Sequence, residues 1–477
     1  MRNVLLASTA LLLLSTSAAY AAKPMSMGEM QAQIEKLSAK IDKLSNVVEK
    51  QQQIITAQKT KIDSQDAQIA EHAQKVSLQE KEIGKLASIA PAAGTAKDDT
   101  GVKITMNPVP KISSADGKYS FQPTARVHFD VTAFNDDKTN QPTGAAMRRM
   151  RLGFKGDLGE DFSYKAEADF ANDGTVIKET YLAYSGLGFA DIWAGSFKPP
   201  VGFEQNTSTN YMPFIENTPA TNAFTRDEIL GGALKGGGDN WSWGAGVFNE
   251  KAGVVNTTRD EGVSLDARVA ANLLGLWGDG KDVLHVGLGA SWRKPNSSTD
   301  SLTISAKPAG VGTNLVSTGA MPDADRSTVI NPELAVAVGP FWAQGEYFRD
   351  SIDLRTAADP VFDGWYAEAG WIMTGEHRPY KGKIGNFERI KPDHPFSLKN
   401  GGWGAWELLG RYDHIDLTDS GAGVFGGEMS NWTVGLNWYM RDNVRMMFDY
   451  EFVNTDQDAE MPDDDPSIFS MRVQYDF

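Results

Sequence analysis

The chain has 477 residues, with 46 Lys and Arg against 62 Asp and Glu, a formal charge of -16 and no Cys. The missing Cys excludes a disulfide scaffold and thiol chemistry, and it suits export to an oxidising compartment. No stretch beyond the N-terminus is apolar enough to cross a bilayer as a helix. A transmembrane barrel stays open, because its lipid-facing and lumen-facing side chains alternate and give an average hydropathy like that of a soluble protein.

Residues 1–21 have the features of a secretory signal peptide. Arg2 supplies the positive start, an apolar run extends from Val4 to Leu14, and Ala19-Tyr20-Ala21 is a small-x-small cleavage site. A membrane anchor is the alternative, but the apolar run is shorter than the roughly 20 residues that a spanning helix needs. We therefore expect the mature chain to begin at Ala22.

Residues 22–90 carry a seven-residue repeat. Every seventh residue from Ile34 to Ile83 is Ile or Val, and Gln occupies four of the eight positions that lie three residues further on. This pattern predicts a periplasmic coiled coil, and the departure from the Ile-and-Leu pattern of dimers favours three strands. A solitary amphipathic helix is the alternative, which would be marginal in water. Residues 91–110, with Pro91 and Gly94, are expected to be a linker.

From residue 111 the period changes to two, as in the final segment, where Phe469, Met471, Val473, Tyr475 and Phe477 alternate with polar residues. A soluble sandwich could alternate too, but the export signal, the aromatic C-terminal residue and the Trp residues near strand ends favour an outer-membrane barrel over residues 111–477. We predict sixteen antiparallel strands, at residues 119–131, 145–156, 161–170, 175–184, 189–198, 228–237, 240–249, 262–273, 282–293, 328–339, 341–350, 362–374, 404–415, 430–440, 443–453 and 467–477.

An even strand count places both ends of the barrel in the periplasm. Residues 199–227 and 294–327 then form extracellular loops three and five, and residues 375–403 form a periplasmic turn. This turn is longer than usual. Either the strand count is wrong, or the turn has a function such as folding back into the pore.

Several motifs resemble the phosphate-selective porin O and P family over roughly residues 110–477. They are Gly195-Ser196-Phe197-Lys198-Pro199-Pro200, Trp371-Ile372, Thr374-Gly375-Glu376, the run from Gly404 to Tyr412, and Asn437-Trp438-Tyr439. The resemblance implies a trimeric sixteen-stranded channel in which loop three, loop five and an inward-folded periplasmic turn narrow the lumen. It also implies a ladder of lumen arginines that leads anions to a lysine-containing constriction.

Basic side chains at the polar positions of the strands, in loop three and in the 375–403 turn are the candidate pore-lining, anion-attracting residues. Arg148, in the apolar phase of its strand, is expected at a membrane edge. The alternative is that the basic residues pair with the acidic residues of the same face and only line a wet wall. The candidates are Arg126, Arg149, Arg151, Lys155, Lys198, Arg226, Arg268, Arg293, Arg378, Lys381, Lys383, Arg411, Arg445 and Arg472.

We therefore predict a non-enzymatic outer-membrane porin for passive diffusion of small anions, phosphate or polyphosphate, with no catalytic residue, metal or cofactor. Gly421 to Gly426 matches a dinucleotide fingerprint by letters but lacks its strand-to-helix context. The alternatives are a general or cation-tolerant diffusion pore and, in another class, a structural tether between outer membrane and cell wall. The expected partners are two further copies in a homotrimer, outer-membrane lipid, inorganic anions and peptidoglycan, reached through the coiled coil, but no nucleic acid.

Overall fold

The computed structural model describes residues 56, 59, 101–106, 109–172, 174–249, 261–277, 281–295, 301–308, 312–457 and 463–477. The chain divides into two compact units, Met1–Asp98 and Asp99–Phe477. Apart from Thr56 and Lys59, the predicted signal peptide and coiled coil lie outside the described residues, so both stay predictions. Within the described ranges, no helix is long and apolar enough to cross a membrane.

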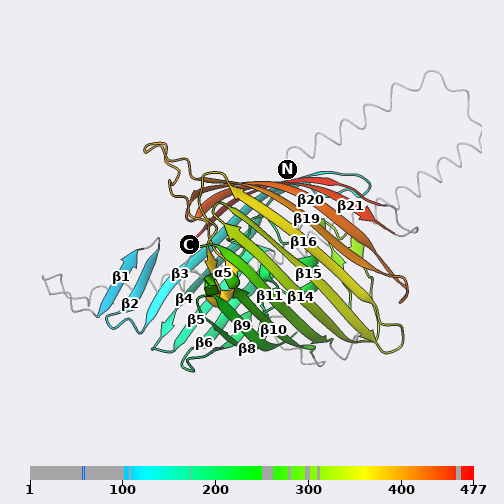
Figure 1. Cartoon of the computed structure of the whole chain (residues 1–477), viewed down its shortest axis with the longest axis horizontal. Coiled ribbons are helices and arrows are strands. Elements are labelled where there is room, and N and C mark those ends of the chain that lie inside the picture. Colours follow the sequence, from blue (N-terminus) through cyan, green and yellow to red (C-terminus); the bar gives the residue numbers. More distant parts are fainter. Residues whose placement is uncertain are drawn as a thin grey trace, which may run out of the picture. The chain divides into compact units, whose positions relative to one another are not determined.

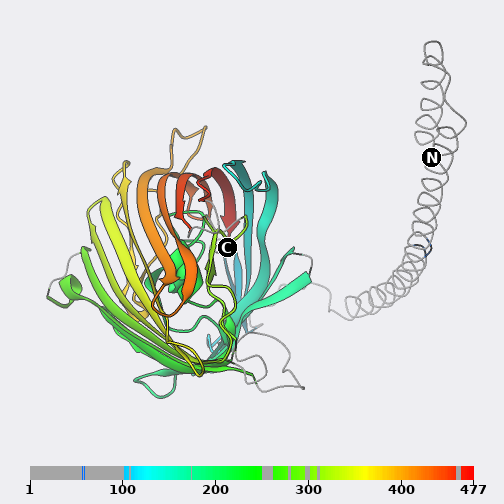
Figure 2. The same ribbon diagram turned by 90° about the vertical axis from the view of Figure 1, so that its right-hand side faces the viewer.

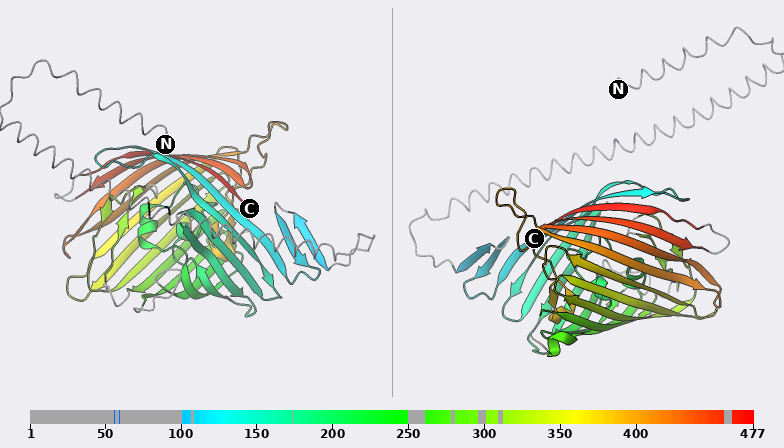
Figure 3. Two further views of the ribbon diagram at one scale, coloured as in Figure 1. Left: turned by 180° about the vertical axis from the view of Figure 1, so that it is seen from behind. Right: turned by 45° about the horizontal axis from the view of Figure 1, so that its top comes forward.

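The second unit is a closed antiparallel barrel (Figures 1 and 3). Each strand pairs with the next, and β22 pairs with β3 to close the ring, so the sixteen predicted strands are confirmed. The strands are β3 (Ser120–Asn135), β4 (Gly144–Leu158), β5 (Phe162–Asn172), β6 (Gly174–Tyr184), β7 (Asp191–Phe197), β8 (Ile229–Gly237), β9 (Trp241–Asn249), β10 (Val263–Asn272), β11 (Val283–Lys294), β14 (Ala324–Val338), β15 (Phe341–Leu354), β16 (Val361–Ile372), β19 (Ala405–Asp419), β20 (Val424–Arg441), β21 (Val444–Asp456) and β22 (Ser467–Asp476).

The period-two pattern separates the two faces of the wall. In β22, Phe469 and Tyr475 are exposed on the outside, whereas Ser470, Arg472 and Gln474 are buried inside. Apolar side chains are exposed on the outside of many other strands as well, which is the surface that a lipid bilayer covers. The polar interior is filled by connecting segments instead of a uniform apolar core.

Three connections carry short elements of their own. Loop three contains α3 (Phe203–Asn206) and α4 (Pro219–Phe224), and Figure 2 shows green helical segments inside the ring of strands. Loop five contains β12 (Ser305–Ala306) and β13 (Val316–Ser317), and the 373–404 turn contains β17 (Tyr380–Lys381), η2 (Gly382–Ile384) and β18 (Asn386–Phe387). A short helix, α5 (Leu273–Trp277), follows β10.

Two strands precede the barrel where the sequence suggested a linker to residue 110. They are β1 (Val102–Met106) and β2 (Pro110–Ser114), which pair with each other. Since β22 pairs with β3 only from Arg126 onward, the start of β3 has free backbone groups on that side, and β2 bonds to them at Ser120 and Phe121. The strands therefore extend the sheet beyond the end of β22.

Candidate functional site

Loop three is fixed inside the barrel by carboxylates of the wall. The Glu346 carboxylate accepts hydrogen bonds from the N–H groups of Phe203 at 2.7 Å and Glu204 at 2.8 Å, where α3 begins. These are donors that the first turn of a helix leaves without intrahelical partners. Further along the loop, the Asp449 carboxylate accepts from the Ile215 N–H at 2.8 Å.

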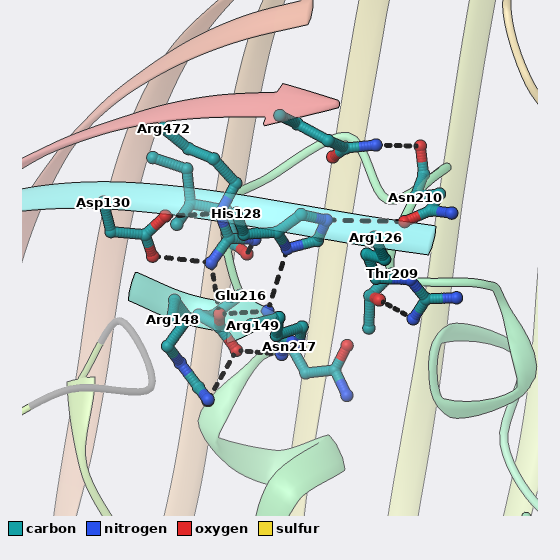
Figure 4. Close-up of polar contacts among 12 residues, drawn as sticks. Arg126, His128, Asp130, Arg148, Arg149, Thr209, Asn210, Glu216, Asn217 and Arg472 are labelled. Carbon is teal, nitrogen blue, oxygen red and sulfur yellow. Dashed lines mark hydrogen bonds and ion pairs between the residues drawn. The ribbon is translucent and has the colours of Figure 1, made fainter. Parts of the chain in front are cut away.

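In loop three, the Glu216 carboxylate forms ion pairs with three guanidinium groups (Figure 4). Arg149 donates to both of its oxygens, at 2.8 and 3.0 Å, Arg472 at 2.6 Å and Arg148 at 3.2 Å. Burial by itself would raise the pKa of the Glu216 carboxyl, but the charges of Arg149, Arg148 and Arg472 hold that pKa well below its ordinary value. We call this arrangement the Glu216 latch.

A β-bulge explains how Arg148 joins the latch. His128 pairs with Arg149 and the next residue, Phe129, pairs with Met147, so Arg148 is an extra residue in β4. An extra residue shifts the alternation of inward and outward side chains. The expected position of Arg148 at a membrane edge is therefore wrong, because strict alternation fails at the bulge.

Other candidate cations also contact loop three. The Arg445 guanidinium donates to the Met212 carbonyl at 2.7 Å, and Arg411 donates to the Glu216 carbonyl at 3.1 Å. Among the remaining contacts are those of Arg126 with Thr209 at 2.6 Å, Lys198 with the Gln205 carbonyl at 2.7 Å, Arg226 with Asp266 at 2.8 Å, and Arg293 with the Phe224 carbonyl. Many of the predicted lumen cations thus hold the loop in place.

The long turn folds back into the lumen, which decides between the two explanations of its length. Arg268 donates to the Gly385 carbonyl at 2.8 Å and to the Asn386 side chain at 3.0 Å. Asn386 in turn donates to the Phe203 carbonyl of α3 at 2.8 Å. The buried Arg378 guanidinium lies 3.8 Å from the Trp342 ring and 4.4 Å from the Phe387 ring.

A cavity of about 540 Å³ remains between the β3–β6 wall, loop three, the long turn, the β20–β21 turn and the end of β22. We call it the lumen cavity. Polar residues of loop three, among them Asn206 and Ser208, form one side of it. Its charged lining comprises the cations Arg126, Arg151, Lys155, Lys165, Lys198, Arg389 and Lys391, and the carboxylates Glu167, Glu179, Glu228, Asp442 and Asp476.

Most of the carboxylates in this lining are already neutralised. Arg151 forms ion pairs with Glu167 at 3.1 Å and with Glu228 at 3.3 Å, Lys165 pairs with Glu179, and Arg389 pairs with Asp476. Burial by itself would raise the pKa of the Glu228 carboxyl, but a hydrogen bond with Asp227 and the positive charges of Arg151, Lys198 and Lys178 lower that pKa.

Four cations of the lining make no ion pair with any described residue. They are Arg126, Lys155, Lys198 and Lys391, against one such side-chain carboxylate, that of Asp442. Arg126 and Lys198 donate to neutral oxygens, and Lys155 and Lys391 are exposed. The lumen cavity therefore has a surplus of uncompensated positive charge.

The fourteen candidates divide into three groups. Arg126, Arg151, Lys155 and Lys198 line the lumen cavity. Lys381 and Lys383 are exposed and lie 3.7 Å from Glu388 and 3.9 Å from Asp191. The other eight, which are Arg149, Arg226, Arg268, Arg293, Arg378, Arg411, Arg445 and Arg472, are not in its lining.

The fourteen candidates leave out three cations of the lining, although the strand alternation and the charge of the long turn point to them. Lys165 occupies an inward-facing position of β5, and Arg389 and Lys391 belong to the net-positive segment of the long turn. The charge of that segment was a usable signal for both. The polar run from Asn206 to Tyr211 in loop three carried no such signal, because only the fold brings it to the cavity.

The barrel part of the chain matches a known protein family. The model of the family described as phosphate-selective porin O and P matches residues 121–477. The chain belongs to this family. As a member of the porin O and P family it is an outer-membrane channel protein, which agrees with the closed barrel and its apolar outer face.

The porin O and P match is accompanied by relatives of similar length. An uncharacterized protein of Caulobacter vibrioides is 30% identical over 362 residues, 73% of this chain and 71% of that protein. Porin O of Pseudomonas aeruginosa is 26% identical over 409 residues, 77% of this chain and 90% of that protein.

Solved porin structures align with the chain as well. OmpT of Vibrio cholerae aligns with a TM-score of 0.49 and 10% identity, covering 75% of this chain and 99% of OmpT. The anion-selective porin from Comamonas acidovorans has a TM-score of 0.49 and 13% identity, covering 75% of this chain and all of that porin.

Proposed function

We propose that the channel passes small anions, phosphate or polyphosphate, by passive diffusion through the lumen cavity. The observation that carries this proposal is the surplus of unpaired cations: Arg126, Lys155, Lys198 and Lys391 against Asp442. Fixed charges of one sign in a narrow polar passage raise the local concentration of ions of the opposite sign. Membership of the porin O and P family and the likeness to Porin O support phosphate as the solute.

The positions of charged side chains should affect ion selectivity more than the total charge of the chain does. At an effective dielectric constant of 20, two unit charges about 4 Å apart interact with about 4 kcal/mol, whereas exposed charges in salt solution are screened within about 8 Å. The side chains of the lumen cavity act on an ion inside the passage. The acidic residues outside it, which dominate the net charge of -16, act mainly in bulk water.

A general or cation-tolerant pore is the second candidate. Glu167, Glu179 and Glu228 in the same lining favour this second candidate. They bring the side-chain charges of the lining close to balance, with seven cations against five carboxylates. A carboxylate that an arginine already neutralises attracts cations weakly, so the ion pairs of Arg151 and Lys165 favour the anion channel.

Reversal potentials of the purified protein in planar bilayers under a salt gradient test the proposal. We expect an anion preference, and phosphate added to chloride solutions should lower the chloride current. A cation-selective potential would overturn the anion proposal in favour of the general pore. Absence of any conductance from correctly folded protein would favour the structural tether between membrane and wall.

For assembly, we propose a homotrimer whose coiled coil lies in the periplasm and reaches peptidoglycan, with the barrel rim at the C-terminus facing the periplasm. The supporting observations are the heptad repeat and the division of the chain after Asp98. A variant without residues 24–90 should still conduct but should assemble, or attach to the wall, less well. Equal recovery of trimers and equal wall attachment in both proteins would contradict this role.

A further inference from the structure

The second half of the long turn, residues 393–404, leaves the lumen and packs on the outside of the barrel. The Phe396 N–H donates to the Met440 carbonyl at 2.8 Å, and the Phe396 ring packs edge-on against the Trp438 ring, 5.0 Å between centroids. The Trp438 indole N–H donates to the Trp403 carbonyl at 2.8 Å. Figure 1 shows this segment in tan, projecting beyond the ends of the strands.

Trp438 faces away from the lumen. Its neighbours in β20, Asn437 and Tyr439, point inward and contact the buried Glu407 carboxylate at 3.0 and 2.6 Å. Successive side chains of a strand point to opposite faces, so Trp438 and, next to Glu407, Trp406 point outward. Their rings stack with 5.1 Å between centroids.

The tip of the segment is a small hairpin. Ser397 pairs with Gly402, and the Gly401 N–H donates to the Ser397 carbonyl at 2.9 Å. The hairpin holds Leu398 91% exposed and Trp403 73% exposed, with Lys399 exposed between them. These are large apolar side chains held in water by a well-bonded turn.

The exposed tip continues the apolar band of the barrel. Trp371 in β16 and Leu408 in β19, on the outer face of the same strand ends, are 44% and 49% exposed. Trp residues are enriched where membrane and water meet, because the indole has an apolar body and a polar N–H. A Lys beside them places its charge at the level of lipid phosphates while its stem stays on apolar surface.

We propose that the 395–403 tip is a membrane-interface anchor that inserts Leu398 and Trp403 among anionic phospholipids, with Lys399 at a headgroup phosphate. The anchor is the outer half of the turn whose inner half, from Arg378 to Lys391, contacts loop three or lines the lumen cavity. The lipid surface and the lumen lining are therefore parts of one short segment. This inference does not depend on the solute that the channel passes.

The absence of Cys from the chain makes the test direct. Leu398→Cys is labelled with an environment-sensitive fluorophore, and the protein is placed in vesicles of phosphatidylethanolamine and phosphatidylglycerol. Leu408→Cys, on the outer face of β19, is the lipid control, and Ser420→Cys, in the exposed turn at the other end of β19, is the water control. Bilayer conductance confirms that each labelled variant is folded.

We expect the Leu398→Cys label to behave like the Leu408→Cys label, with blue-shifted emission that brominated lipid quenches and iodide does not. Quenching by iodide, as for Ser420→Cys, would show that the tip is in water and would overturn the proposal. Protection from both quenchers would also overturn it, because a protein surface such as a second copy would then cover the tip.

Lys399→Gln tests the choice of lipid in the same assay. Replacing phosphatidylglycerol by phosphatidylcholine should reduce lipid quenching of the Leu398→Cys label, and the Lys399→Gln variant should lose this dependence on lipid charge. Lys281→Gln, which removes an exposed cation elsewhere, is the matched control and should keep it. If Lys399→Gln kept the full dependence, the headgroup contact would be wrong.

Discussion

Arg472 in the last strand donates a hydrogen bond of 2.6 Å to Glu216, which lies 256 residues earlier in loop three. The same guanidinium forms two hydrogen bonds of 2.7 Å with Asp130 in β3, the strand that closes the ring with β22. One side chain therefore joins barrel closure to the placement of loop three. The contact of Arg472 with loop three therefore depends on the position of the last strand.

Glu216→Gln should destabilise the protein, because it leaves the buried Arg149 guanidinium without its countercharge and removes one of the two carboxylates that pair with Arg472. Breaking a buried charge pair in this way costs about 3–5 kcal/mol. Denaturant unfolding in detergent measures it, and a looser loop should add current noise in single-channel records. Glu160→Gln, which removes an exposed pair with Lys118, is the control and should cost at most about 1 kcal/mol. Equal costs would show that the Glu216 latch is not structural.

The latch also predicts an acid dependence. Because the folded-state pKa of Glu216 is below its ordinary value, its stabilisation is present above the ordinary carboxyl pKa and is lost as the pH falls through the folded value. Loop three should therefore stay fixed at neutral and mildly acidic pH. The free energy of unfolding, measured from about pH 7 to pH 3, should fall at the acid end of this range. The fall should be smaller in Glu216→Gln than in the parent protein, since Gln does not titrate. A loss centred near neutral pH would contradict this assignment.

Lys155→Gln and Lys391→Gln should lower the anion preference, since each removes an unpaired cation of the lumen cavity. Both side chains are exposed, so the free energy of unfolding of each variant should stay within about 0.5 kcal/mol of that of the parent protein. The reversal potential under a salt gradient measures the effect, and the double variant should shift it further than either single change. Lys281→Gln, outside the cavity lining, should leave it unchanged. An effect of Lys281→Gln as large as theirs would mean that total charge governs selectivity.

Arg151→Gln should change both selectivity and stability, because this arginine lines the lumen cavity and also pairs with acidic residues of the same face, which the sequence left open as the alternative role. Arg151 pairs with Glu167, Asp169 and Glu228, so its removal takes the shared cation from three buried carboxylates, although Glu167 keeps Lys165 and Glu228 keeps Lys178. We expect a cost of about 3–5 kcal/mol and a shift of the reversal potential toward cations. A shift without any loss of stability would show that the ion pairs contribute little to folding.

Asp464→Asn should weaken the fold locally without changing ion preference. The buried carboxylate accepts hydrogen bonds from the N–H groups of Lys138 at 3.1 Å and Thr139 at 3.0 Å, and leaving such a group imperfectly paired costs roughly 1–3 kcal/mol. Asp463→Asn, at an exposed neighbour, should cost less than about 0.5 kcal/mol. Reversal potentials of both should match the parent. A shift in either would mean that loop acids govern selectivity.

The sequence by itself determined the barrel, because an inward or outward position is a local property of each strand. Alternation at period two marked the wall, and the length of the 375–403 turn marked a connection with an additional role. Family motifs such as Asn437-Trp438-Tyr439 then predicted a family that the match over residues 121–477 confirms.

Only the tertiary structure decided what each inward-facing cation does. Arg149 and Lys155 occupy the same face of β4, yet Arg149 is buried against Glu216 and Lys155 is exposed in the lumen cavity. The difference depends on where loop three and the long turn lie, and those segments are fixed by contacts between residues hundreds of positions apart. A single bulge likewise turned Arg148 inward, because one extra residue shifts the alternation locally. Strand periodicity contains no information about such long-range partners, and charge pairing depends on them.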